Sequence, residues 1–275
     1  MHRHHGEPKP IKIPTTLRQG VIDEVVRILR MPFEVLICVY VNAVLTTVLY
    51  FFAPATIYGL FFSVKGVLLF PAVLSGWMLA DVPATNEIAP DRLRMLACIG
   101  DERQLVLMLR AKHLVLWLLI TPVALTAAAL VGANSQRWST TILVMVFVVT
   151  VPFASLGVSC FIGVYWPYHP IALKERWAQR HNFKQMILRW GILVTAPYVL
   201  VPAFGYLSFL PAGIVWEIFK PPKNSPTTDL SILITLLVSM PLAFLVWDRG
   251  TRRAAKVIVK RQGVLTAYLN DPSLG

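Results

Sequence analysis

Long apolar runs alternate with polar and charged stretches along most of this chain. Six of the runs come close to the ~20 residues that an α-helix needs to cross the hydrocarbon core of a bilayer. They are Val35–Ala53, Ile57–Ala80, Leu114–Gly132, Thr140–Val164, Trp190–Leu210 and Leu230–Trp247. The pattern therefore predicts an all-α membrane protein in which residues 34–247 form a domain of six transmembrane helices.

The stretch before the first run has a different pattern. Residues 1–16 are rich in Pro and His, and we predict a disordered cytoplasmic tail there. In residues 17–33, apolar side chains recur at helical spacing among charged ones. These apolar positions are Leu17, Val21, Val25, Ile28 and Leu29. Since a helix of this kind is too charged to span, we predict an amphipathic helix that lies along the membrane interface.

The segment Asp81–His113 separates the second and third runs and is not a simple linker. It carries five acidic and five basic residues, so it cannot lie in lipid. It has no Gly/Ser tract, and residues such as Leu93, Leu96 and Leu105 give it apolar faces. We predict a folded amphipathic element on the membrane surface. The alternative is a solvated loop that only joins two spans.

Basic residues indicate which way the chain is oriented. Of 26 Lys and Arg residues, 22 lie in the first 34 residues, in Asp81–His113, in residues 165–189 and after Trp247. Because loops rich in Lys and Arg stay in the cytoplasm, both termini are predicted to be cytoplasmic. The chain is then a multi-pass protein of the cell (plasma) membrane, and residues 248–275 form a basic cytoplasmic tail.

Composition agrees with a membrane protein. The 275 residues are 56% hydrophobic and 15% charged, against about 25% charged residues in soluble domains. A net charge of +12 would suggest nucleic acid as a partner of a soluble protein, but here the bases follow the membrane topology. We therefore predict the lipid bilayer as a partner and no nucleic acid. The cysteines Cys38, Cys98 and Cys160 do not have the spacing of a metal site.

Several catalytic motifs are missing from the sequence. It has no G-x-x-x-x-G-K-[ST] phosphate loop, no H-E-x-x-H and no G-x-S-x-G. The six runs contain no acidic residue and no histidine, which argues against an intramembrane proton relay. We predict that the chain is not an enzyme, with no catalytic, metal or cofactor-binding residues of its own.

Polar residues in or near the runs are candidates for a solute path. They are Asn42, Thr46, Lys65, Tyr198 and Glu217. Four of them have a simpler alternative: interhelical hydrogen bonds for Asn42 and Thr46, snorkelling for Lys65, and the interfacial aromatic belt for Tyr198. Small residues four apart in the fourth run, at Ser155, Ser159 and Gly163, predict either close packing on another helix or ordinary tolerance of small residues.

Several stretches together resemble one known family. Asn86–Asp91 reads NEIAPD, Gly100–Arg103 reads GDER, and Lys112 is a base at the start of the third run. Ser159–Gly163 (SCFIG) leads into a WPYHP stretch that begins at Trp166. With an interfacial helix, six spans and charged loops after the second and fourth, nearly the whole chain resembles the permease subunit of an ABC exporter of the type-2 kind.

The resemblance implies cytoplasmic coupling helices seated on separate ABC ATPase subunits, which would hold ATP and Mg. One coupling helix would lie in Asp91–Arg110, and a second contact would follow the fourth span. The residues implied are Asp91, Arg94, Gly100, Asp101, Glu102, Arg103, Lys174, Glu175 and Arg176. A second permease, identical (a homodimer) or related, is implied as well. Since the spans offer few charged groups, the solute would be amphipathic or apolar, such as a drug, peptide or lipid.

Two other classes of function stay open at this point. One is a non-transporting membrane scaffold whose charged loops dock cytoplasmic partners. The other is an integral membrane enzyme that uses Asp91, Asp101 or His113 at the cytoplasmic face. The enzyme would show an activity without nucleotide, whereas in a scaffold no partner's ATP hydrolysis would affect solute movement.

Overall fold

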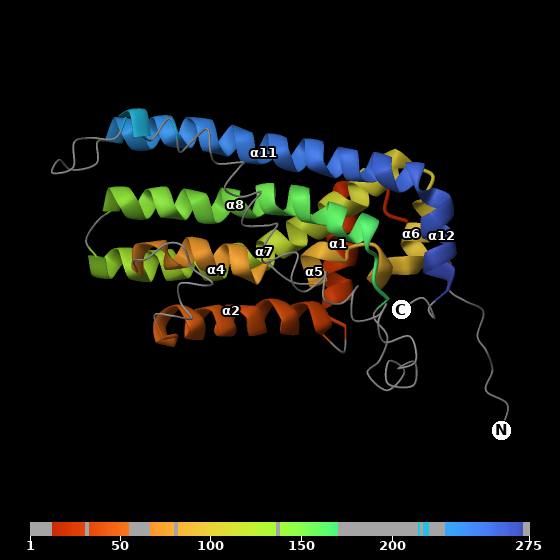
Figure 1. The fold of residues 1–275 in the computed structure, drawn as a ribbon, viewed down its shortest axis with the longest axis horizontal. Coiled ribbons are helices and arrows are strands. Elements are labelled where there is room, and N and C mark those ends of the chain that lie inside the picture. The colour runs from red at the N-terminus through yellow and green to blue at the C-terminus, as the bar shows by residue number, and fades with distance from the viewer. Residues whose placement is uncertain are drawn as a thin grey trace, which may run out of the picture.

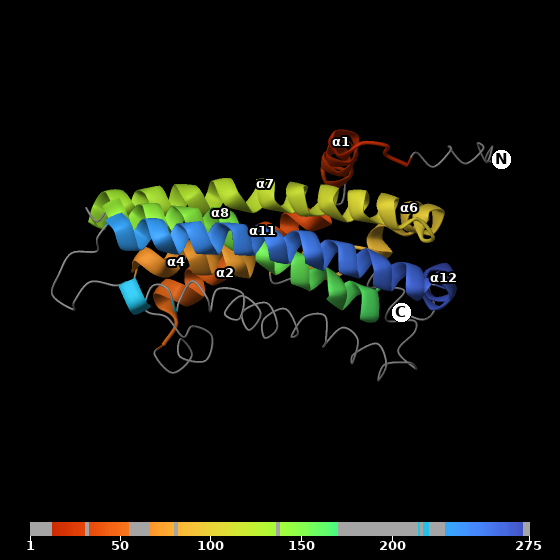
Figure 2. The same cartoon turned by 90° about the horizontal axis from the view of Figure 1, so that it is seen from above.

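The computed structural model describes residues 13–30, 33–54, 67–79, 82–135, 138–169, 214, 217–219 and 229–271. Helices make up nearly all of these residues, and none of them forms a strand. Long helices run side by side in an elongated bundle, and several short helices gather at one end of it (Figures 1 and 2). The described part of the chain is therefore all-α, as predicted.

Four helices have the length and the apolar composition needed to cross a membrane. They are α2 (Glu34–Phe52), α7 (Glu102–Ser135), α8 (Trp138–Tyr165) and α11 (Asp229–Lys260). These four coincide with the first, third, fourth and sixth predicted runs, which supports a multi-pass membrane protein. The second run is described only in part, as η1 (Val67–Leu69) and α4 (Phe70–Met78). The fifth run lies outside the described residues.

Two of the long helices extend past their predicted boundaries. α7 begins at Glu102 rather than at Leu114, and α11 continues to Lys260, so that the first part of the predicted tail is helical. At 1.5 Å per residue, each helix is about 50 Å long, against ~30 Å for the core of a bilayer. The predicted boundaries were wrong because an apolar run ends at the first charges, whereas the helix does not.

The predicted coupling segment Asp91–Arg110 is also not one helix. Its parts are η2 (Ala89–Asp91), α6 (Arg92–Cys98) and the start of α7. Between the last two, the backbone N–H of Asp101 donates to the carbonyl oxygen of Cys98 at 2.8 Å, which closes a tight turn. The segment therefore contains a short helix, a tight turn and the first residues of a long helix.

One end of the bundle is a folded unit that we call the end domain. It consists of α5 (Val82–Thr85), η2, α6 and α12 (Gln262–Asn270), together with the adjoining ends of α7, α8 and α11 (Figure 1). A continuous apolar core holds η2, α6 and α12 on the ends of α7, α8 and α11. Its fully buried large side chains are Ile88, Met95, Leu105, Leu109, Ile258, Leu265 and Leu269. The described part of Asp81–His113 is thus packed and is not a solvated loop.

Helix α1 (Leu17–Ile28) lies across α7 near the end domain (Figure 2). Gly20 makes the close approach possible, since a Cβ there would lie 3.0 Å from the Cβ of Ala111. Glu24 and Ile28 are buried against the bundle, whereas Ile22, Val26 and Leu29 are exposed. α1 therefore has an outward apolar stripe in addition to the face that it buries.

Helices α8 and α11 touch through their backbones. A Cβ at Gly250 would lie 2.0 Å from the carbonyl oxygen of Gly157, so only glycine fits at this crossing. Further along α8, Ser155 and Ser159 are buried, and a Cβ at Gly163 would lie 2.2 Å from the carbonyl oxygen of Thr85. The predicted close packing of the small residues in α8 is confirmed.

Candidate functional site

The exposed turn between α6 and α7 carries four of the residues predicted to contact an ATPase. Gly100, Asp101, Glu102 and Arg103 are all exposed. The Asp101 side chain caps α7, because its Oδ1 accepts from the backbone N–H of Arg103 at 2.9 Å and of Gln104 at 3.1 Å. The structure thus brings these four residues together at the tip of the end domain and gives Asp101 a structural role there.

A buried network of ion pairs lies behind this turn and uses two other predicted coupling residues. The Nζ of Lys112 is 3.3 Å from Asp91 Oδ2 and 3.6 Å from Glu24 Oε1. Arg94 pairs with Asp91 at 3.2 Å, and the Nε of Arg27 donates to Glu24 at 2.9 Å. Asp91 and Arg94 therefore bind within the protein, where they connect α1, η2, α6 and α7.

Electrostatics keep the acid at the centre of this network ionised. Burial raises the pKa of Glu24, but the charges of Lys112 and Arg27 outweigh that effect and lower it from 4.5 to about 2. The same carboxylate raises the pKa of Arg27 against the opposing effect of burial. α1 is thus held on the bundle by full charges that remain paired near neutral pH.

A second buried cluster links the end domain to two membrane helices. The Nε1 of Trp247 donates to His113 Nδ1 at 2.9 Å, and His113 Nε2 lies 2.9 Å from Glu87 Oε1. Because an indole N–H can only donate, Nδ1 must accept, so Nε2 carries the proton and donates to Glu87. His113 and Glu87 are both almost completely buried. The connection runs from the α5–η2 link through α7 to α11.

The NEIAPD motif also forms hydrogen bonds with the residues just after α8. Asn86 Nδ2 donates to the carbonyl oxygen of Tyr168 at 2.6 Å, and the backbone N–H of Tyr168 donates to Asn86 Oδ1 at 3.2 Å. Nearby, Arg261 donates to the carbonyl oxygen of Val164 at 2.7 Å. The structure therefore joins NEIAPD to the WPYHP stretch, two motifs that the sequence singled out separately.

The predicted solute-path residues are only partly described. Asn42 and Thr46 are buried on one face of α2, and Thr46 Oγ1 has no hydrogen-bond partner among the described residues. Glu217 is exposed. Lys65, Tyr198 and residues 174–176, which include Lys174, Glu175 and Arg176, lie outside the described residues. The structure thus brings together only Asn42 and Thr46 of this set.

Sequence reasoning missed most of the buried polar contacts. His113 was considered only as a catalytic residue, and Glu87, Trp247 and Glu24 were not considered. The partners of His113 lie 26 to 138 positions away along the chain, a separation at which no spacing rule operates. A weak signal existed, because Glu87 is the one charged residue within the stretch VPATNEIAP.

The described residues do not form a catalytic cluster from the three enzyme candidates. Asp91 pairs with Lys112, Asp101 caps α7, and His113 lies between Glu87 and Trp247. No group of three or more His, Cys, Asp or Glu that could hold a metal ion occurs among the residues that the structure describes. These three side chains are instead used in internal contacts that connect or cap helices.

Comparison with protein-family models, with curated proteins and with solved structures gives no match for this chain.

Proposed function

We propose that this chain is the membrane-spanning permease subunit of an ABC exporter, with six spans and both termini in the cytoplasm. Separate ATPase subunits would dock on the end domain, with ATP and Mg held by those subunits. α1 would lie in the interface, where Ile22, Val26 and Leu29 would enter the lipid. The observation that supports the proposal best is the continuous buried connection from the exposed α6–α7 turn into α7, α8 and α11.

This connection fits the transmission of motion. Packed interiors have low compressibility, so a push on one part of the end domain moves the rest with it. Glu87 contacts His113 on α7, the adjacent Asn86 contacts Tyr168 just after α8, and Arg261 contacts Val164 on α8. A motor that moved the α6–α7 turn would therefore tilt three membrane helices, as alternating access requires.

The remaining parts of the proposal follow from what one copy lacks. The sequence has no phosphate loop, so energy must come from another chain. One set of six spans makes a poor pathway alone, and a second permease, identical or related, would complete it. The path between them would use Asn42, Thr46, Lys65, Tyr198 and Glu217 for an amphipathic or apolar solute.

The docking surface would be the exposed side of α6 and the turn after it. Leu93 on α6 is 57% exposed and lies between Arg92 and Arg94 in the sequence. It would enter an apolar groove of the ATPase, while Asp101, Glu102 and Arg103 would form the polar rim. A second contact would come from Lys174, Glu175 and Arg176.

Co-purification after co-expression with candidate phosphate-loop ATPases tests this proposal. The full chain should retain one ATPase in mild detergent, and Leu93→Asp should lower the recovered ATPase by about tenfold, equivalent to ~1.4 kcal/mol. Val264→Asp is a matched control, since Val264 on α12 is 63% exposed and is not assigned to the docking surface. A chain that purifies alone with every candidate would contradict the proposal and favour the membrane scaffold.

A further inference from the structure

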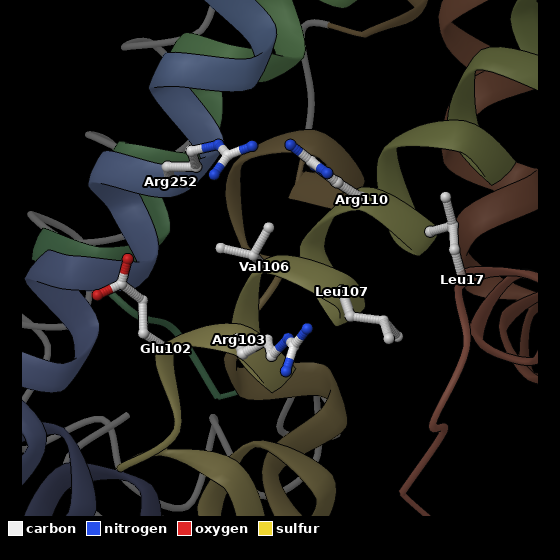
Figure 3. Close-up of a pocket in the computed structure, with 7 residues that line it drawn as sticks. All are labelled: Leu17, Glu102, Arg103, Val106, Leu107, Arg110 and Arg252. Atoms are coloured by element: carbon white, nitrogen blue, oxygen red, sulfur yellow. The ribbon is translucent and has the colours of Figure 1, made fainter.

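A basic cavity of about 450 Å³ lies against the first turns of α7, between α11 and the start of α1 (Figure 3). Its polar lining includes three guanidinium groups, from Arg103 and Arg110 on α7 and from Arg252 on α11. Figure 3 shows Arg110 and Arg252 pointing toward each other above Val106, with Arg103 on the other side of it. Val106, Leu107 and Leu17 supply an apolar floor and wall.

The cavity has more positive charge than its carboxylates neutralise. Asp248 pairs with both Arg110 and Arg252, the latter at 3.0 Å, and Glu102 lies at the edge of the lining. Arg103 forms no ion pair with any residue that the structure describes. The buried Nε of Arg110 likewise has no acceptor among them. Three guanidinium groups therefore face two carboxylates, which leaves one positive charge unmatched.

The depth of the cavity is set by the ends of the apolar runs. Arg110 precedes the run that begins at Leu114, and its partner Asp248 directly follows the run that ends at Trp247. From Arg110 to Arg103, α7 rises by about 10 Å away from the apolar part. Since the head-group region adds ~5–8 Å to each side of the hydrocarbon core, the cavity spans the level of the phospholipid phosphates.

We propose that this cavity binds the phosphodiester head group of an anionic phospholipid. The guanidinium groups would hold the phosphate by charge-assisted hydrogen bonds, and Val106, Leu107 and Leu17 would contact the glycerol and the upper acyl chain. A basic pocket between membrane helices at head-group depth is a recurrent form of lipid recognition. Free phosphate would match the charge but would leave the apolar floor empty. The site does not depend on the proposed transport function.

Binding of dioctanoyl phosphatidylglycerol to the detergent-purified full chain, followed by native mass spectrometry, tests the site. The double variant R103Q/R252Q should bind this lipid at least about tenfold more weakly, because each basic residue near an anionic lipid contributes roughly a fivefold change. The double variant R249Q/R253Q removes the same charge from exposed positions beside Arg252 that do not line the cavity. It should bind within about twofold of the wild type, because exposed charges that do not contact the phosphate are screened by salt.

Two further comparisons separate the lipid from other sources of the same chemistry. Dioctanoyl phosphatidylcholine, whose head group has no net charge, should bind weakly, and inorganic phosphate at millimolar concentration should not displace phosphatidylglycerol. Displacement by phosphate would overturn the assignment to a lipid. Equal weakening in R103Q/R252Q and R249Q/R253Q would show that binding follows net charge alone and would overturn the site.

The carboxylate in the lining provides a test of opposite sign. Glu102→Gln removes the negative charge of the one acidic residue among the described residues that line the cavity and should strengthen phosphatidylglycerol binding by about two- to threefold, as an exposed charge does. Glu102 is exposed, so this variant is expected to fold normally. Unfolding or distortion would weaken binding, so a gain cannot come from structural damage. Unchanged or weaker binding in Glu102→Gln would contradict the proposed position of the phosphate.

Discussion

Glu24 shows how a single charged residue fixes a helix that would otherwise be held weakly. Glu24 is 5% exposed. The other buried positions of α1 are Gly20 and Ile28, and Gly20 has no side chain to add apolar contacts. An unpaired buried carboxylate would be strongly destabilising, so the pairs with Lys112 and Arg27 are essential to the docking of α1. The low pKa of Glu24 reflects the same pairs.

The first prediction concerns the pH dependence that Glu24 confers. Its pKa is about 2 in the folded chain against an ordinary value of 4.5, so its stabilising effect is complete above 4.5 and is lost as the pH falls toward 2. The Glu24 contribution should fall by about 2 kcal/mol between neutral pH and about pH 3. Glu24→Gln should be less stable than the wild type near neutral pH, and the two thermal unfolding curves should converge in acid.

The neighbouring acid supplies the control for this experiment. Asp23 lies beside Glu24 on α1 and has no ion pair within the described part of the chain, so Asp23→Asn should keep the wild-type pH profile. If Glu24→Gln and wild type lost stability in parallel down to about pH 3, the assignment of this pH dependence to Glu24 would be wrong.

Single residues were the level at which the sequence was least informative. Asp91 and Arg94 were predicted to contact a partner, but they form ion pairs inside the protein. Lys112 lies two residues before the apolar run that begins at Leu114, and its buried charge is paired with Asp91. A charged residue in an amphipathic segment can serve either a surface or a buried network, and sequence spacing does not separate the two. The ATPase contact of these residues stays a prediction.

At the scale of helices, α8 and α11 make a close backbone contact. Without side chains between them, Gly157 and Gly250 let the two backbones meet, and a Cβ at Gly157 would lie 2.6 Å from the Cα of Trp247. Such crossings give membrane helices their van der Waals contact, since lipid supplies little hydrophobic driving force. The crossing also positions Trp247 for its hydrogen bond to His113.

The second prediction tests this crossing with one methyl group. Gly250→Ala places a Cβ where the carbonyl oxygen of Gly157 would be 2.0 Å away, so the helices must separate. We expect a loss of stability of about 1–3 kcal/mol, measured as a lower midpoint of thermal unfolding in detergent.

A glycine in an open position is the matched control. Gly76 in α4 has no atom within 4 Å of the position of a Cβ, so Gly76→Ala should be neutral or stabilising by up to about 1 kcal/mol. Equal midpoints for Gly250→Ala and the wild type would mean that α8 and α11 do not cross at these glycines.

Helices were predicted far better than their ends. The apolar runs located α2, α7, α8 and α11 because lipid requires unbroken apolar helices of a minimum length. The same requirement says nothing about residues outside the lipid, where Leu105, Met108 and Leu109 continue the apolar face of α7 between charges. The turn that separates α6 from α7 falls at the GDER stretch, which the sequence singled out without assigning a turn to it.

At the scale of the whole molecule, one end of the bundle is a packed domain that carries many charged residues. In the end domain, segments from the middle and from the C-terminal part of the chain share one core. All of these segments must therefore lie on the same side of the membrane. The distribution of bases predicts that this end is cytoplasmic. Glu217, which follows the fifth run, is predicted to lie on the opposite side.

The third prediction is that two single cysteines react from opposite sides of the membrane. Gly263→Cys on α12 and Glu217→Cys both replace exposed residues, and a Cβ at Gly263 meets no atom within 4 Å. In intact cells, a membrane-impermeant maleimide should label Glu217→Cys and should label Gly263→Cys only after the membrane is opened. All samples carry Cys38→Ser, because Cys38 is half-buried and could itself react. The control is the Cys38→Ser chain without an added cysteine.

The two other native cysteines should not be labelled by the maleimide. Cys160 is buried in α8, and burial, together with the charges of Asp91 and Asp101, raises the pKa of Cys98 to about 11. Since the thiolate is the reactive form, Cys98 should react slowly near neutral pH. Labelling of Gly263→Cys in intact cells would place the end domain outside. An ATPase in the cytoplasm could then not reach α6, and the proposed permease would be excluded together with its topology.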